Sequence, residues 1–300
     1  MAKELKNVAA SVKARLKEIA RKNNKDFNAL CLQYCQERFL YRISLSRYKK
    51  SFILKGGLSL LALDMPSERP TKDMDFLAQA ISNELENVKR IFSEIITIQE
   101  NDGLVFDSEI KTQSIVPDAK YEGVRVKIVS FIERARYDLI VDIGFSDRLL
   151  SPSEEKPFPV LLNGFENPVI KIYPAEQVIA EKFEAIVKLY TQNSRIKDFY
   201  DIAFISSEKK FKHSELNKVI FHTFKNRNTL IEDKEKIFRN DFKENKEMQK
   251  QWDAFLKRNK LKSEFTFFQI MEKIECFIQP VCIEQEIEHI WQAGKWRPEI

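Results

Sequence analysis

Two aspartates with the spacing of a β-strand are the residues whose types most directly suggest chemistry. Asp73 and Asp75 lie two residues apart beside a strand-like run, residues 74–78, so their side chains project from the same face. Carboxylates this close repel each other unless a cation neutralises them. Mg²⁺ does so with oxygen ligands and leaves room for substrate phosphates. The alternative is a chance pair of solvated carboxylates, so the surrounding residues decide between the two.

A third carboxylate ends another predicted strand. Residues 124–131 alternate apolar and polar side chains, and residues 133–136 turn the chain into a second strand over 137–143. Asp142 ends this antiparallel hairpin, where it could complete a cluster with the Asp-x-Asp pair. Two metal ions in such a cluster would clamp the attacking and leaving oxygens of an in-line displacement.

A glycine pair precedes the aspartates. Gly56 and Gly57 lie between the short apolar run 52–54 and a segment with helical spacing. Their backbone amides could face an anion at the start of the helix, and Ser59 adds a hydroxyl nearby. The alternative is a tight strand-to-helix turn that needs a positive φ. The order of glycine pair, aspartate pair and later aspartate is more specific than any one of them.

The elements that must position these residues form an α+β pattern. Apolar periodicity predicts two helices in the first fifty residues, the second capped by Asp26, and a further helix from Ser82, as N-cap, to Thr97. Strands are predicted at residues 52–54, 74–78, 124–131, 137–143 and 169–172. We therefore expect a small mixed sheet flanked by helices.

The second half of the chain is predicted to be helical. Pro174 suits the first turn of a helix that continues to about Tyr190, and a short helix follows from Asp198. Beyond residue 207 the chain is charged and helical in period. The predicted parts are N-terminal helices packed on the core at 1–50, a core at 51–173, and a helical C-terminal domain at 174–300 that completes the active site.

Composition and net charge exclude few classes of function. The 300 residues carry a net charge of +5, which is compatible with a polyanionic partner but also with many other soluble proteins. No apolar run is long enough to cross a bilayer and the N-terminus lacks a signal-peptide pattern, so we expect a cytoplasmic protein without a membrane partner. Cys31 and Cys35 share a helix face and are interpreted as core thiols in a reducing compartment; half of a zinc site is the alternative.

Five sequence blocks carry a resemblance to a known family. They are Lys55–Leu61, Arg69–Phe76, Val141–Asp147, Tyr173–Lys182 and Ser194–Ile202. Their order and spacing resemble the nucleotidyltransferases of the DNA polymerase β superfamily. More narrowly, they resemble the AbiEii/AbiGii family of nucleotidyltransferase toxins, to which the mycobacterial MenT toxins also belong. The superfamily generally has Gly-Ser at the glycine motif. Here the hydroxyl of Ser59 is displaced, which leaves open the group that contacts the γ-phosphate.

The resemblance implies a polymerase β-like core and a set of site residues. Catalytic roles would fall to Asp73, Asp75, Lys182 and Asp198, and metal binding to Asp73, Asp75 and Asp142. Nucleotide binding would fall to Lys55, Gly56, Gly57, Ser59, Arg69, Thr71 and Lys182. The lysine would neutralise triphosphate charge, and Asp198 would either orient it or act as a base. Arg195, Lys197 and Lys188 are either phosphate or RNA contacts or a solvated basic face, and Asp201 either caps a helix or pairs locally.

The function implied is that of a Mg²⁺- or Mn²⁺-dependent toxin of a toxin–antitoxin or abortive-infection system, which would act in antiviral defence. It would transfer a pyrimidine nucleotide from a nucleoside triphosphate (NTP) to an RNA hydroxyl, with the tRNA 3′ end as the expected acceptor, and so block translation. The expected partner is an AbiEi-like antitoxin encoded upstream. The alternative is a protein of this fold that modifies a protein hydroxyl, or a non-catalytic nucleotide-binding module. The intact catalytic set argues against a non-catalytic module.

Overall fold

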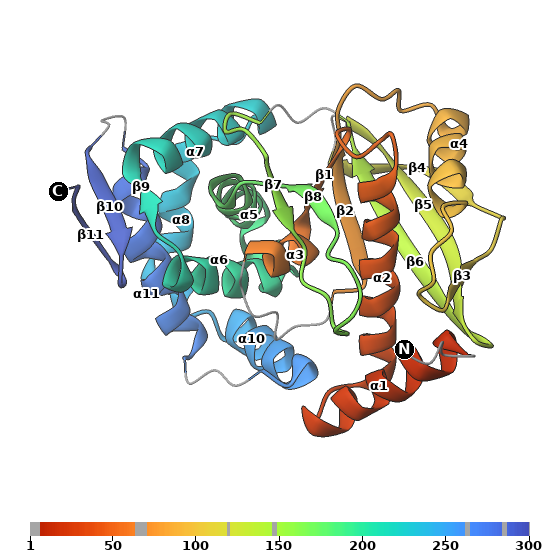
Figure 1. Ribbon diagram of the computed structural model, residues 1–300. Helices are drawn as coiled ribbons and strands as arrows, with labels where there is room; N and C mark the ends of the chain where they lie inside the picture. Colours follow the sequence, from red (N-terminus) through yellow and green to blue (C-terminus); the bar gives the residue numbers. More distant parts are fainter. Residues whose placement is uncertain are drawn as a thin grey trace. The chain divides into compact units, whose positions relative to one another are not determined.

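The computed structural model divides the chain into two compact units (Figure 1). The first holds residues up to 148 together with 153–173, and the second holds 149–152 and 174–300. The structure describes residues 7–63, 71–118, 121–145, 149–261, 265–283 and 287–299. No helix in these ranges is both long and apolar enough to cross a membrane.

The first unit is built on a mixed eight-stranded sheet. Its strands are β1 (Phe52–Lys55), β2 (Asp73–Ala78), β3 (Leu104–Phe106), β4 (Lys111–Asp118), β5 (Tyr121–Ile132), β6 (Ala135–Gly144), β7 (Glu154–Pro157) and β8 (Val169–Ile172). The order is β3-β5-β6-β2-β1-β8-β7, with β4 also paired to β5. β2 runs parallel to β6, and β1 runs parallel to β8. The predicted mixed sheet and hairpin are therefore confirmed.

Three helices accompany this sheet: α1 (Val8–Lys22), α2 (Phe27–Leu45) and α4 (Leu85–Ile96). The predicted N-cap of α2 is confirmed, because the Asp26 carboxylate accepts from the amide of Ala29 at 2.7 Å. The prediction that Ser82 caps α4 is wrong. The Ser82 hydroxyl instead accepts from the amide of Glu84 at 3.3 Å, and this local turn delays the helix to Leu85.

The apolar face of the sheet packs against α2 and α4. The ring of Phe52 lies 5.7 Å from that of Phe76 on β2 and 5.5 Å from that of Phe92 on α4, and Phe92 stacks on Phe39 of α2 at 5.8 Å. Met74, Phe76 and Ala78 of β2 are buried. Because side chains alternate along a strand, Asp73 and Asp75 project from the opposite face.

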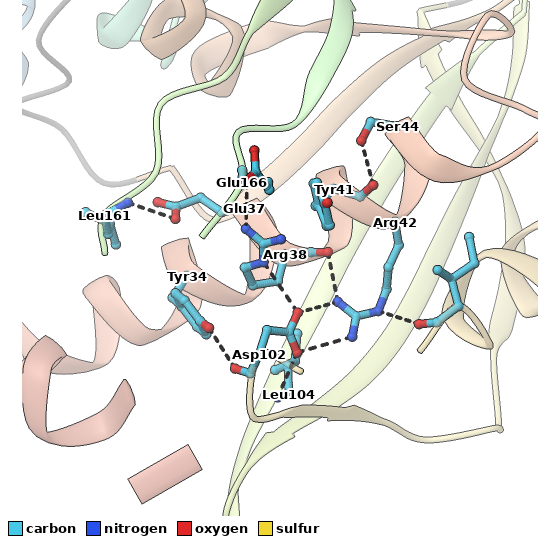
Figure 2. A network of polar contacts seen from close by, with 11 residues as sticks. Tyr34, Glu37, Arg38, Tyr41, Arg42, Ser44, Asp102, Leu104, Leu161 and Glu166 are labelled. Atoms are coloured by element: carbon cyan, nitrogen blue, oxygen red, sulfur yellow. Dashed lines mark hydrogen bonds and ion pairs between the residues drawn. The ribbon is translucent and has the colours of Figure 1, made fainter. Parts of the chain in front are cut away.

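Helix α2 is fixed by a buried polar network (Figure 2). Arg42 donates to both oxygens of Asp102 at 2.7 and 3.2 Å, and Arg38 donates to the same carboxylate. The Tyr34 hydroxyl donates to the Asp102 carbonyl at 2.7 Å. Glu37 accepts from the amide of Leu161 at 3.0 Å. The arginines and Asp102 are almost fully buried and mutually satisfied, which makes α2 a rigid element.

The second unit is mainly helical, as predicted. Its helices are α5 (Ala175–Leu189), α6 (Ile196–Glu208), α7 (His213–Arg227), α8 (Lys234–Phe238), α9 (Asn240–Lys243), α10 (Lys246–Asn259) and α11 (Phe267–Ile278). Pro174 was predicted as the first helical residue but is the N-cap of α5, so the helix begins at Ala175, one residue later than predicted. The short four-residue helix α3 (Gly56–Ser59) belongs to the first unit.

A three-stranded sheet corrects the prediction that everything beyond residue 207 is helical. It consists of β9 (Phe211–Lys212), β10 (His289–Gln292) and β11 (Lys295–Pro298). Trp291 and Trp296 pair across the hairpin, and their indole N–H groups donate to the carbonyls of Ser206 and Phe277 at 2.6 and 2.9 Å. Trp291 is buried and Trp296 is half-buried, and these aromatic contacts stabilise strands that have too few residues to show a period.

Candidate active site

The glycine turn lies against the aspartate pair. β1 ends at Lys55, and Gly56 follows with a φ of +69°. A Cβ atom placed on Gly56 would stand 2.0 Å from Oδ2 of Asp75. Glycine is thus required here both for the backbone conformation and for the close approach of the carboxylate. The predicted glycine turn and the predicted aspartate pair therefore meet at one point of the sheet.

Four charged residues form a row across the face opposite α2. In the strand register, Lys55 on β1 lies opposite Asp75 on β2. Asp75 in turn lies opposite Asp142 on β6, and Asp142 lies opposite Arg125 on β5. Residues paired in this way on adjacent strands point to the same face. Asp73, two residues before Asp75, shares that face. The structure therefore brings the three predicted carboxylates together between two cationic side chains.

Arg125 was missed by the sequence reasoning. Its guanidinium grips Asp142 in a bidentate pair, with Nε to Oδ1 and Nη2 to Oδ2 both at 2.7 Å. This hydrogen bonding raises the pKa of Arg125, and the charges of Asp142, Asp73 and Asp75 add to the rise, partly offset by burial. The third carboxylate is therefore held in place by a cation of the protein itself.

The remaining predicted nucleotide contacts differ in accessibility. Ser59 is fully buried and its hydroxyl donates to the carbonyl of Gly56 at 2.8 Å, so it closes the turn. Lys55 is half-buried, with Nζ 5.6 Å from the centre of the Tyr173 ring. Gly57 lies in α3, and Thr71 is half-buried just before β2. Arg69 lies outside the described residues.

Lys182 and Asp198 meet in the second unit. Nζ of Lys182 on α5 donates to Oδ1 of Asp198 and to Oδ2 of Asp201, both on α6 and both at 2.7 Å. Arg195 donates from Nε to the other oxygen of Asp198 at 2.7 Å. Asp198 and Asp201 are three residues apart, so they share one face of α6. Asp201 thus pairs with Lys182 on a different helix, which is neither a helix cap nor a local pair.

Electrostatics keep this cluster charged. Burial alone would lower the pKa of Lys182, but Asp198 and Asp201 outweigh it and hold that pKa above its usual value. Burial would likewise raise the pKa of Asp198, yet Lys182 and Arg195 hold it below its usual value. Asp198 is thus held by Lys182 and Arg195 in a position to orient the lysine, and its role in catalysis stays a prediction.

The other predicted basic residues and cysteines have distinct environments. Lys188 and Lys197 are exposed on the second unit. Cys31 and Cys35 are buried thiols, as predicted, and burial raises the pKa of Cys35 to about 12. Across the described ranges, no group of three or more His, Cys, Asp or Glu side chains is arranged to hold a metal by itself.

A family model and two solved structures are similar to this chain. The family model described as "Nucleotidyl transferase AbiEii toxin, Type IV TA system" matches residues 38–270. The crystal structure of JHP933 from Helicobacter pylori has a TM-score of 0.51 at 14% identity, covering 86% of this chain and 93% of that one, and shows a shared fold. A second H. pylori structure, of a candidate nucleotidyltransferase, has a TM-score of 0.41 at 16% identity, covering 83% of this chain and 95% of that one. No curated protein matches the chain.

Proposed function

Because the chain belongs to the AbiEii family of nucleotidyl transferase toxins of type IV toxin–antitoxin systems, we propose that it transfers a nucleoside monophosphate to an RNA hydroxyl. The observation that carries the proposal is the placement of Asp73 and Asp75 on one face of β2, with Asp75 against Gly56. In this reaction the acceptor oxygen bonds to the α-phosphorus of the triphosphate and the bond to the β-phosphate oxygen breaks. Pyrophosphate leaves with that oxygen, and the hydroxyl proton passes to a base or to water.

The donor set at β2 fits Mg²⁺ or Mn²⁺. Such ions are commonly bound by one or two carboxylates together with substrate phosphates, and Asp73 and Asp75 supply two carboxylates on one face. When bound, the ion would neutralise phosphate charge and stabilise the attacking and leaving oxygens. Both oxygens of Asp142 accept from Arg125 at 2.7 Å, so metal binding by Asp142 stays a prediction.

The protein's own cations would complete the charge balance. Lys55 and Arg125 flank the carboxylates in the sheet, where they can bind and orient triphosphate oxygens. In the second unit, Lys182 stays protonated, and the carboxylates of Asp198 and Asp201 fix its direction. The family resemblance implies a catalytic role for Lys182 as well, and that role stays a prediction.

RNA is the proposed acceptor and a protein antitoxin the proposed partner. The family of type IV toxins implies an antitoxin, for which an AbiEi-like protein encoded upstream is the expected form. The tRNA 3′ end and a pyrimidine triphosphate are proposed from the resemblance of the five sequence blocks. The net charge of +5 and the exposed Lys188 and Lys197 are compatible with contacts to RNA phosphates.

Labelling of acceptors tests the proposal. The purified protein would be incubated with total RNA, a cell extract and each α-labelled triphosphate in Mg²⁺. We expect label on tRNA-sized RNA, its loss in Asp75→Asn, and its retention in Asp138→Asn, which removes an exposed carboxylate of β6. Label on protein instead of RNA would overturn the acceptor and support modification of a protein hydroxyl.

Toxicity is a separate claim and has its own test. Expression of the wild-type chain should arrest growth, and Asp75→Ala should relieve the arrest at equal protein level. An alanine variant that stays equally toxic would show that the proposed chemistry is not the cause of toxicity.

A further inference from the structure

A buried glutamine of α2 reaches the chain just before the aspartate pair. Gln36 is only 1% exposed. Its side-chain Nε2 donates to the carbonyl oxygen of Thr71 at 3.2 Å and to that of Lys72 at 3.0 Å. These are the two residues immediately before Asp73. One amide group from a distant helix thus holds two consecutive backbone carbonyls at the entrance to β2.

The tether acts just beyond the end of the ladder between β1 and β2. The ladder between β1 and β2 pairs residues 52–55 with 75–78, so its last pair is Lys55 with Asp75. On the side of β6 the ladder continues to Asp73, which pairs with Ile140. Among the strands of the described ranges, the backbone of Asp73 is therefore paired with β6 alone. Gln36 supplies donors to the two preceding residues at the point where pairing with β1 has ended.

Gln36 stands on a rigid base. The next residue, Glu37, accepts from the amide of Leu161 at 3.0 Å, and Arg38 donates to the carbonyl of Glu166 at 3.0 Å (Figure 2). One turn further on, Arg42 is paired with the buried Asp102. Neighbouring residues of α2 are thus anchored to separate segments of the first unit. A side chain on a well-anchored helix can hold in place the groups to which it hydrogen-bonds.

The side-chain amide of Gln36 is only half satisfied: its nitrogen has partners and its oxygen has none among the described residues. Within the described part of the chain, its Oε1 is buried without a hydrogen-bond partner. A buried acceptor without a partner is destabilising, and a methionine of similar length would avoid this penalty. What glutamine provides at this position, and methionine would not, is therefore the N–H group that donates to the two carbonyls.

We infer that Gln36 is a positioning residue, which fixes the backbone before Asp73 so that the carboxylates of Asp73 and Asp75 are preorganised for a divalent ion. The ion itself rests on the proposed function. The tether does not, because it is a feature of the metal-free protein. Supporting groups of this kind commonly change metal affinity by about tenfold to a hundredfold.

Gln36→Met and Gln33→Met form a matched pair of variants. Both replace a glutamine of α2 by methionine, but Gln33 bonds Glu37 of its own helix at 3.4 Å and does not reach β2. Hydrogen exchange of the metal-free protein and titration of Mn²⁺ alone, followed by electron paramagnetic resonance, are the two measurements. In Gln36→Met we expect roughly tenfold faster exchange at residues 72–74, as loss of two ordinary hydrogen bonds implies. Mn²⁺ binding should weaken by about tenfold, and Gln33→Met should match the wild type.

The outcomes separate this inference from the proposed function. Unchanged exchange at residues 72–74 in Gln36→Met would overturn the tether. Wild-type Mn²⁺ affinity in the same variant, with binding still lost in Asp75→Asn, would overturn the positioning role alone. A wild-type protein that binds no Mn²⁺ would overturn both that role and the metal site. If Gln36→Met does not fold, Gln36→Asn keeps the amide but shortens its reach, and the same criteria apply to it.

Discussion

Replacing Gly56 by alanine should disable the site by displacing one side chain. The new Cβ would stand 2.0 Å from Oδ2 and 2.8 Å from Cγ of Asp75, whereas ordinary contacts begin at 3.4 Å. The oxygen would therefore have to move by more than 1 Å. The backbone of β2 is held by β1 and β6 on either side, so the movement falls on the Asp75 side chain.

Gly56→Ala should have two effects, backbone strain at residue 56 and displacement of the Asp75 side chain. The φ of +69° at Gly56 is unfavourable for alanine by about 1–2 kcal/mol, which lowers the free energy of unfolding. Displacement of a reacting-site group by about 1 Å can reduce turnover by roughly a hundredfold. We therefore expect a modest loss of stability and a large loss of both Mn²⁺ affinity and transfer rate.

Gly164→Ala is the control for backbone strain. Gly164 also has a positive φ, +92°, and a Cβ placed on it would meet no described atom within 4 Å. Denaturant unfolding, Mn²⁺ titration and label transfer would be measured for both variants. Gly164→Ala should lose stability and keep its affinity for Mn²⁺. Should Gly56→Ala keep wild-type Mn²⁺ affinity, the contact between Gly56 and Asp75 would not matter to the site, and the reasoning fails.

Three further substitutions test the electrostatics. Arg125→Gln removes the cation beside three carboxylates, so Mn²⁺ titration should show binding tighter by roughly threefold to tenfold; weaker binding would mean that Arg125 serves chiefly to orient Asp142. Burial raises the pKa of Glu37 to about 8, above its value in the unfolded chain. The folded state therefore keeps the Glu37 proton up to a higher pH than the unfolded chain does. The free energy of unfolding falls as pH rises from the unfolded pKa to the folded pKa of about 8. Glu37→Gln should gain over the wild type by up to about 1.4 kcal/mol per pH unit between about pH 4.5 and 8 in denaturant unfolding; a pH-independent difference would contradict this. Lys182→Met leaves Asp198 and Asp201 buried without their ammonium, so thermal unfolding should show a loss of about 3–5 kcal/mol at neutral pH that shrinks on acidification; a loss that stays constant with pH would refute the pairing.

Local patterns were sufficient for much of the first unit. Alternation placed Asp73 and Asp75 on one face, and the hairpin placed Asp142 on a strand of its own. Arg125 was also within reach of the sequence. The hairpin closes with Ile132 paired to Ala135, and counting back from this two-residue turn sets Arg125 opposite Asp142. The residues alone also allow a longer turn over 133–136, and a longer turn leaves the register of the hairpin open.

Long-range partners could not be read from local patterns. Gln36 bonds residues 35 and 36 positions away along the chain, and nothing in the helical period of α2 indicates that contact. The strand β9 has two residues, too few to show alternation, and it forms because β10 provides a partner. Asp201 pairs with Lys182 because α5 and α6 bring their faces together, which depends on tertiary packing.

The rate of label transfer from an α-labelled triphosphate to RNA, measured against Mg²⁺ concentration, shows whether the aspartates of β2 carry out nucleotidyl transfer. The wild type and Asp138→Asn should show the same saturable dependence on Mg²⁺, and Asp75→Asn should show no transfer above background at any concentration. Transfer by Asp75→Asn at the wild-type rate, or no transfer by the wild type with any triphosphate, would contradict the assignment of nucleotidyl transfer to the aspartates of β2.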